Sequence, residues 1–372
     1  MNQIMEAIQK YYLKVNALKQ KDFGHNGPYY DEQTLVRVVA HEIFIFAYFF
    51  EKTKNQYFLN LMTQNANYLI SKEAIPFDKV FYCRKNPHKD LSNGVIGQAW
   101  AIEGLVKAYE VLKDKRYFDK AIEIFNNHPF DEKNCVWYTL NVDGSIRGID
   151  KTFNHQLWMA ASGFQILSLK DDSEVRRKCE SFMRNISELH LIYNCGLIKH
   201  PLNISSKKTF FLKGVRFLHR IKKMNFNQTF KYKENGYHLF NMYGLALIKK
   251  YGGSLDFFDS KMFKKELEYS FSNKLIKWLE EDDLSKDINS MKNIKHPHMN
   301  IYGYPYNAPA FELPLIYQQF SSNVGDKKDL LDYYWQKQVE LTYDQSKKGF
   351  FRNTEDSITL NARLYEFVRA LD

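Results

Sequence analysis

The chain has 372 residues, enough for one large domain or two average ones, and its 44% hydrophobic content is that of a globular protein. Its net charge of +10 favours an anionic partner, which is a nucleic acid, an anionic glycan or a lipid surface. The sequence has no zinc-finger spacing, Walker loop or RNP-like strand, so we expect no nucleic-acid partner.

The four cysteines are scattered and form no CxxC pair, which argues against a clustered zinc site and is compatible with reduced thiols. Residues 1–20 carry charges within a helical pattern and lack the apolar core of a secretory signal. No apolar run approaches the length of a membrane span. We therefore expect a cytoplasmic protein with no cofactor and no metal ion.

Apolar residues recur at helical spacing and predict twelve helices. The first covers 2–19, and Asp31 is expected to cap the second, which runs to Phe50. The others are expected at 56–71, 95–112, 116–127, from 154, and at 172–190, 236–250, 262–281, 308–320, 327–343 and 359–371. Between the fifth and sixth, residues 136–149 predict a β-hairpin, because Asp143-Gly144 suits a two-residue primed turn.

The even-numbered helices of this series are apolar around most of their circumference, whereas the odd-numbered ones are amphipathic and charged. A helix that is apolar all round is buried, and one with a polar face lies at the surface. The alternation predicts an all-α (α/α)6 barrel over residues 1–372 as a single domain, with the β-hairpin near the pocket mouth. An open helical solenoid is the alternative.

The inner helices begin with polar residues, and in such a barrel they are parallel, so their first turns gather at one end. We therefore expect these openings to face a single pocket. They begin at Asn93, Asn154, Asn235, Asn307 and Thr359.

Residues at about 194–234 depart from the helical alternation and predict a basic insertion. Within it, residues 210–223 form a basic amphipathic segment. The segment either makes a peripheral contact with an anionic membrane surface or packs its Phe and Leu side chains on the barrel.

Two short motifs resemble the six-hairpin glycosidase superfamily, which includes unsaturated glucuronyl and rhamnogalacturonyl hydrolases and, more distantly, N-acylglucosamine 2-epimerases. The run from Gly97 to Trp100 is similar to the Gly-x-x-Trp opening of an inner helix, and the run from Gly196 to His200 is similar to a Gly-Leu-hydrophobic-x-His loop. Pro201 follows where the hydrolases ordinarily continue with Gly-Tyr-Asp. The resemblance implies an (α/α)6 barrel that uses either an aspartate or histidines for proton transfer.

Hydrolysis of a glycosidic bond conventionally needs two carboxyl groups across the bond. Asp150 is the candidate general acid and base, and helix capping is its alternative role. Glu312 is the candidate second carboxylate or orienting group, and a buried ion pair with Arg363 is its alternative. His155 and His238 follow an Asn at matching openings, which suits the proton transfer of an epimerase, although structural roles remain open for both.

The residues expected to bind substrate lie at or near the helix openings. Aromatic rings there can stack on sugar faces, and polar groups can bind hydroxyl groups or a carboxylate. The parallel inner helices also aim their positive dipole ends at the pocket, which favours an acidic sugar. The predicted binding residues are Gln98, Trp100, His200, Tyr237, Asn241, Tyr304, Tyr306, Asn361 and Arg363.

The sequence therefore predicts a carbohydrate-active enzyme, namely a glycoside hydrolase acting on an acidic or N-acetylated glycan in, for example, surface-polysaccharide metabolism. A sugar epimerase or isomerase with a histidine pair is one alternative. A non-catalytic glycan-binding protein of polysaccharide assembly is the other.

Overall fold

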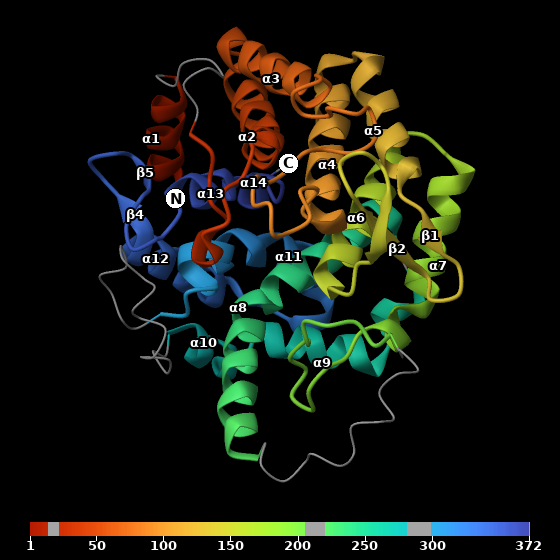
Figure 1. Cartoon of the computed structure of the whole chain (residues 1–372). Coiled ribbons are helices and arrows are strands. Elements are labelled where there is room, and N and C mark those ends of the chain that lie inside the picture. The colour runs from red at the N-terminus through yellow and green to blue at the C-terminus, as the bar shows by residue number, and fades with distance from the viewer. Residues whose placement is uncertain (14–21, 205–219, 254, 281–298, 372) are drawn as a thin grey trace.

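The computed structural model describes residues 1–13, 22–204, 220–253, 255–280 and 299–371, without the side chains of 220–229. Its helices follow one another around the molecule in chain order, from the red end of the colour scale to the blue end (Figure 1). The chain passes back and forth between an inner ring and an outer layer, and the inner helices are apolar all round whereas the outer ones are apolar on one face only.

Each inner helix packs against the next, and α14 closes the ring against α2. Every residue of α4 from Gly94 to Val106 is buried, as expected for a helix with neighbours on all sides. This arrangement confirms the predicted (α/α)6 barrel. The inner helices are α2 (Val36–Thr53), α4 (Gly94–Leu112), α6 (Phe153–Leu169), α8 (Arg220–Gly252), α11 (Pro309–Val324), and the pair α13 (Ser357–Ala362) and α14 (Leu364–Val368).

The outer helices bury one apolar stripe against this ring. In α7, for example, Val175, Cys179, Phe182 and Ile186 are buried at helical spacing. A short 3-10 turn, η4 (Asp256–Asp259), precedes α9. The outer helices are α1 (Asn2–Tyr12), α3 (Gln56–Leu69), α5 (Lys115–Asn127), α7 (Ser173–Leu189), α9 (Lys261–Ser270), α10 (Asn273–Glu280) and α12 (Lys328–Thr342).

The predicted β-hairpin is present as β2 (Val136–Leu140) and β3 (Ile146–Ile149), with β1 (Phe130–Asp131) added antiparallel to β2. Its predicted two-residue turn is wrong. The Asn141 N–H donates to the Ser145 carbonyl at 2.8 Å, so the loop has three residues, 142–144. Gly144 takes φ +90, the left-handed conformation such a loop needs at its last position. A second hairpin, β4 (Tyr343–Asp344) and β5 (Gly349–Phe350), was not predicted.

Several predicted boundaries also need correction. Helix α2 begins at Val36, and Asp31 pairs with Arg84 instead of capping it. The predicted helix 262–281 is divided into α9 and α10, and the last inner helix breaks at Arg363.

Helix α8 runs from Arg220 to Gly252, so residues 220–234 of the predicted insertion belong to an inner helix. The insertion itself stays a prediction. Residues 205–219 and the side chains through 229 lie outside the described part, so the membrane contact or barrel packing of 210–223 stays a prediction. Within the described residues, no helix combines the length and the apolarity needed to cross a membrane.

Candidate active site

Residues in or next to the inner helices surround a cavity of about 210 Å³. Asn93, Asn154, Asn307 and Arg363 line it, together with Tyr237 from α8. The 3-10 turn η2 (Gly27–Tyr29) and the π-helical turn η6 (Gly303–Asn307) complete its wall. The prediction that the polar openings share one pocket is therefore confirmed.

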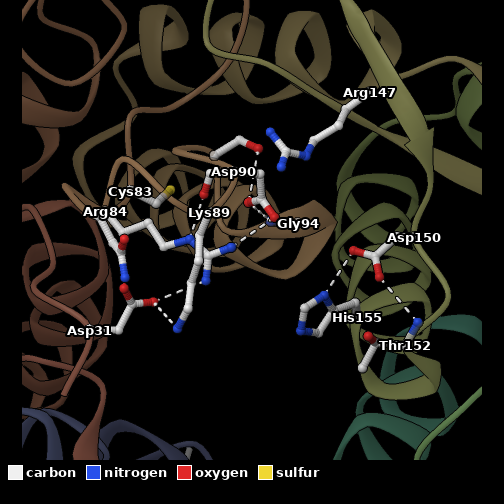
Figure 2. A network of polar contacts seen from close by, with 12 residues as sticks. Asp31, Cys83, Arg84, Lys89, Asp90, Gly94, Arg147, Asp150, Thr152 and His155 are labelled. Atoms are coloured by element: carbon white, nitrogen blue, oxygen red, sulfur yellow. Dashed lines mark hydrogen bonds and ion pairs between the residues drawn. The ribbon is translucent and has the colours of Figure 1, made fainter. Parts of the chain in front are cut away.

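Asp150 and His155 form a hydrogen-bonded pair at the edge of this cavity (Figure 2). Asp150 directly follows β3, and His155 lies in the first turn of α6. The His155 Nδ1–H donates to Asp150 Oδ2 at 2.8 Å, because a carboxylate only accepts. The opposite nitrogen, Nε2, has no hydrogen-bond partner among the described residues, and the ring lines the cavity.

Backbone amides also hold the Asp150 carboxylate. It accepts from the Val95 N–H and the Thr152 N–H, each at 3.1 Å. Burial alone raises the pKa of Asp150, but the charge and hydrogen bond of His155 and these two amides outweigh burial and keep the pKa below its ordinary value. Asp150 is therefore ionised near neutral pH and fixes the orientation of the His155 ring.

The beginning of α4 is shaped around this pair. Gly94 has φ +59, and a Cβ there would lie 2.4 Å from Asp150 Oδ2 and 2.5 Å from His155 Nδ1. The Gly94 N–H donates to Asp90 Oδ1 at 2.7 Å. Two carboxylates thus bind adjacent amides at the helix start, where the helix dipole favours negative charge.

His200 brings a second imidazole to the cavity. The Phe153 N–H donates to the His200 carbonyl at 3.0 Å, which fastens the histidine loop to the beginning of α6. Burial, followed by the charges of Lys233 and His155, lowers the pKa of His200 to about 3. The imidazole is therefore neutral near pH 7.

Aromatic rings form another part of the wall. Trp100, Tyr237 and Tyr306, all predicted to bind substrate, line the cavity together with Tyr29. The hydroxyl groups of Tyr29 and Tyr237 are hydrogen-bonded at 2.8 Å, so these two rings are held together. Sugar stacking on this wall stays a prediction.

Gln98 and Asn361 do not line the cavity, because the backbone uses their amide groups. Gln98 accepts from the Phe81 N–H at 2.7 Å and donates to the Phe81 carbonyl at 3.0 Å. Gln156 holds Trp137 in the same way, and Asn361 holds Phe350. The amide side chains of these openings therefore anchor the preceding strand or loop to an inner helix.

Three further predicted residues lie in the barrel wall. His238 is fully buried against α9, and its Nε2 lies 3.0 Å from Ser270 Oγ. Asn241 donates to the Tyr237 carbonyl within α8 at 3.0 Å. The Tyr304 hydroxyl donates to Glu280 Oε1 at 3.3 Å. None of the three lines the cavity, and the contacts they make are within the barrel wall.

Glu312 also lies outside the cavity lining, and its alternative role, an ion pair with Arg363, is the one observed. Arg363 Nη2 lies 3.1 Å from Glu312 Oε1 and 3.2 Å from Glu366 Oε1. Arg363 Nε and Nη2 also donate to Asn307. Arg363 lines the cavity, but its guanidinium is already engaged by these partners.

Sequence reasoning missed the cavity residues Arg37, Arg84, Lys89 and Lys233. The available signal was the isolated charge of Arg37 at the apolar beginning of α2. Arg84 pairs with Asp31 and Asp90, and Lys89 pairs with Asp31 (Figure 2). In the described part of the chain, no group of three His, Cys, Asp or Glu side chains is placed to hold a metal ion.

The fold is that of the six-hairpin glycosidase superfamily. A cellobiose 2-epimerase from Bacillus thermoamylovorans superposes with a TM-score of 0.63 at 12% identity, over 99% of this chain and all of that chain. An α-1,6-mannanase from a Salegentibacter species superposes with a TM-score of 0.55 at 11% identity, over 100% of this chain and 99% of that chain. At these identities, the likeness concerns the fold.

Among proteins with this fold, the chain belongs to the family of archaeal glycosylation protein Q. It is 32% identical over 360 residues to the protein of that name from Haloferax volcanii, covering 94% of this chain and 91% of the relative. No family model matches the sequence.

Proposed function

We propose that the protein is a sugar epimerase or isomerase in which His155 and His200 transfer a proton at a sugar carbon. One observation carries this proposal. Two imidazoles line the cavity, whereas no Asp or Glu side chain of the described residues does. The described cavity lining therefore lacks the two carboxylates that would flank a glycosidic bond. It has instead two imidazoles, which can act as the acid and the base for proton transfer at carbon.

The two histidines have different surroundings, which suits them to different roles. The lowered pKa of His200 keeps its imidazole neutral near pH 7, so a ring nitrogen has a lone pair that accepts a proton from the carbon next to the sugar carbonyl group. His155 in its imidazolium form, with Nδ1–H held by ionised Asp150, donates the proton of Nε2 to the same or the adjacent carbon, and proton exchange with solvent then restores both histidines. Asp150 is a positioning residue in this scheme, since it touches His155 and does not line the cavity.

The size of the cavity and its aromatic wall support a small sugar or the end of a glycan as the substrate. Its volume of about 210 Å³ is below the ~300–1,000 Å³ of sites for larger ligands. The relative from Haloferax volcanii is named as a glycosylation protein, which supports a substrate from glycan assembly.

Proton transfer at carbon can be tested by incubating the enzyme in D2O with hexoses, hexuronic acids, hexose phosphates and N-acetylhexosamines, and following deuterium at carbon by NMR. We expect exchange with at least one sugar, and a loss of about 10²–10⁴-fold in each of His155→Asn and His200→Asn. Arg176→Gln, at an exposed ion pair on α7, is the matched control and keeps full exchange. Exchange that persists in both histidine variants excludes the proposal.

A glycoside hydrolase is the second candidate, and the two carboxylates at the beginning of α4 favour it. In this alternative, ionised Asp150 is the general base and Asp90, rather than Glu312, is the second carboxylate. Hydrolysis of an oligosaccharide that is lost in Asp90→Asn and Asp150→Asn but retained in His200→Asn would establish this alternative and exclude the epimerase.

A further inference from the structure

The interior of the barrel next to the cavity contains three buried arginines, and two of them have carboxylate partners. Arg369 Nη1 lies 3.0 Å from Glu103 Oε1, and Arg363 is shared by Glu312 and Glu366. Burial raises the pKa of Glu366 to about 7, and burial followed by repulsion from Glu366 raises that of Glu312. The raised pKa values favour protonation of one of these two carboxyl groups, and the negative charge of the other balances Arg363.

Arg37 differs from these two residues. Its side chain is only 2% exposed, and no carboxylate of the described residues lies within ion-pair distance of it. Nη1 donates to Asn26 Oδ1 at 3.0 Å, whereas Nε and Nη2 are buried without a hydrogen-bond partner in the described residues. The charge of Arg37 lowers the pKa of Glu366, but the carboxylate of Glu366 is already paired with Arg363.

A buried charge without a partner is costly, so an unpaired guanidinium that lines a cavity indicates a ligand that pairs with it. The Arg37 guanidinium is also held in place, since its Cζ lies 4.3 Å from the Trp100 ring centre and 5.7 Å from that of Tyr306. A fixed guanidinium with two free donor atoms matches the two oxygens of an oxyanion.

A second cation without an ion pair, Lys233, lies against the tyrosines of the aromatic wall. Lys233 Nζ is 5.1 Å from the centre of the Tyr29 ring and 5.7 Å from that of Tyr237. No carboxylate of the described residues is within ion-pair distance of Lys233, whereas Arg84 and Lys89 are neutralised by Asp31 and Asp90. The cavity thus has two unpaired positive charges and no carboxylate in its lining.

We infer that the substrate carries an oxyanion, a carboxylate or phosphate group on the sugar, and that Arg37 binds this group while Lys233 adds attraction from the tyrosine wall. This inference rests on the proposed function in taking the cavity as the substrate site. Arg37 takes the anion-binding role that the sequence assigned to Arg363.

The test measures binding by calorimetry at constant ionic strength, so that it does not depend on turnover. The probes are glucuronate, galacturonate and mannuronate, the 1- and 6-phosphates of glucose and mannose, and the matching neutral hexoses. We expect an anionic sugar to bind at least tenfold more tightly than its neutral counterpart. Arg37→Gln should weaken that binding by about 10–100-fold, as for a lost charge-assisted pair, and Arg37→Lys should weaken it less.

The class of probe that binds best identifies the oxyanion as carboxylate or phosphate, and either result supports the inference. The melting temperature separates a binding role from a structural one. Because the buried charge has no partner, unliganded Arg37→Gln should melt at or above the wild-type temperature. Equal binding of anionic and neutral sugars, no binding of any anionic probe, or unchanged binding in Arg37→Gln each overturn the inference. Deuterium exchange of an anionic sugar that is undiminished in Arg37→Gln would refute the anion site and leave the proposed reaction standing.

Discussion

His155 and His238 are similar in sequence and different in surroundings. Each follows an asparagine at the opening of an inner helix, yet His155 lines the cavity and His238 is buried in the wall between α8 and α9. One ring is held by a carboxylate and leaves a nitrogen free, whereas the other is enclosed by Ser270 and backbone groups. Local sequence context alone therefore does not assign a histidine to the site.

The direction of each side chain explains the difference. His155 lies in the first turn of α6 and faces the cavity. His238 lies within α8, directly after Tyr237, which lines the cavity. One residue along a helix turns the side-chain direction by about 100°, so Tyr237 faces the cavity while His238 faces α9.

The largest expected effect sharpens this comparison directly. His155→Asn should lower the rate of carbon-bound proton exchange by about 10²–10⁴-fold and leave the melting temperature near that of the wild type. His238→Asn should do the reverse, retaining the exchange rate and losing about 2–3 kcal/mol of stability from the buried hydrogen bonds. Kinetics in D2O and thermal melts of both variants measure this. Equal loss of exchange in the two variants would place His238 in the site.

The next largest effect is expected at Gly94, which lies against the Asp150–His155 pair. Gly94→Ala adds a Cβ against Asp150 and His155 and strains the left-handed backbone, so it should abolish most of the exchange and destabilise the fold. Gly253→Ala is the matched control, since Gly253 also has positive φ but has open space around it. It should cost about 1–2 kcal/mol and leave exchange intact. The account is wrong on this point if Gly94→Ala has the activity of Gly253→Ala.

The free energy of unfolding should depend on pH through His238, the histidine in the barrel wall. Burial lowers the pKa of His238 to about 3, so below pH ~6.5 the unfolded chain binds a proton that the native state does not. This residue therefore stabilises the protein fully above pH 6.5 and progressively less as the pH falls toward 3. His238→Asn should flatten the stability curve by up to about 1.4 kcal/mol per pH unit across that range. Denaturant unfolding at pH 7, 6 and 5 measures the slopes, and unchanged slopes contradict the assignment.

The smallest effect concerns the partner of the wall histidine. Ser270→Ala removes a buried hydroxyl group that lies 3.0 Å from His238 Nε2, while the Glu266 carbonyl at 3.1 Å remains available to the ring. A loss of about 1 kcal/mol is therefore expected, with exchange unchanged. Thermal melts and the D2O assay measure both quantities, and a change in exchange rate would connect this part of the wall to the site.

The fold could be predicted because apolar periodicity survives in a single sequence and separates inner from outer helices. Asp150 and His155 could each be predicted as candidates because both lie near the beginning of α6, but the hydrogen bond between them could not. The uses of Gln98 and Asn361 were not accessible, because their backbone partners lie 11–17 residues away and depend on loop geometry. That Arg37 has no ion-pair partner among the described residues could not be predicted, because it is seen only when the positions of all the buried glutamates in the folded barrel are known.

The central claim is that the cavity performs proton transfer at a sugar carbon, and one mass measurement tests it. The enzyme is incubated with its best-binding sugar and with an oligosaccharide ending in that sugar, in water enriched in both deuterium and oxygen-18. We predict a product carrying deuterium on carbon, formed without cleavage of the oligosaccharide and absent in His155→Asn. Oxygen-18 in a released sugar whose carbon-bound hydrogens are unexchanged would contradict the account and establish hydrolysis.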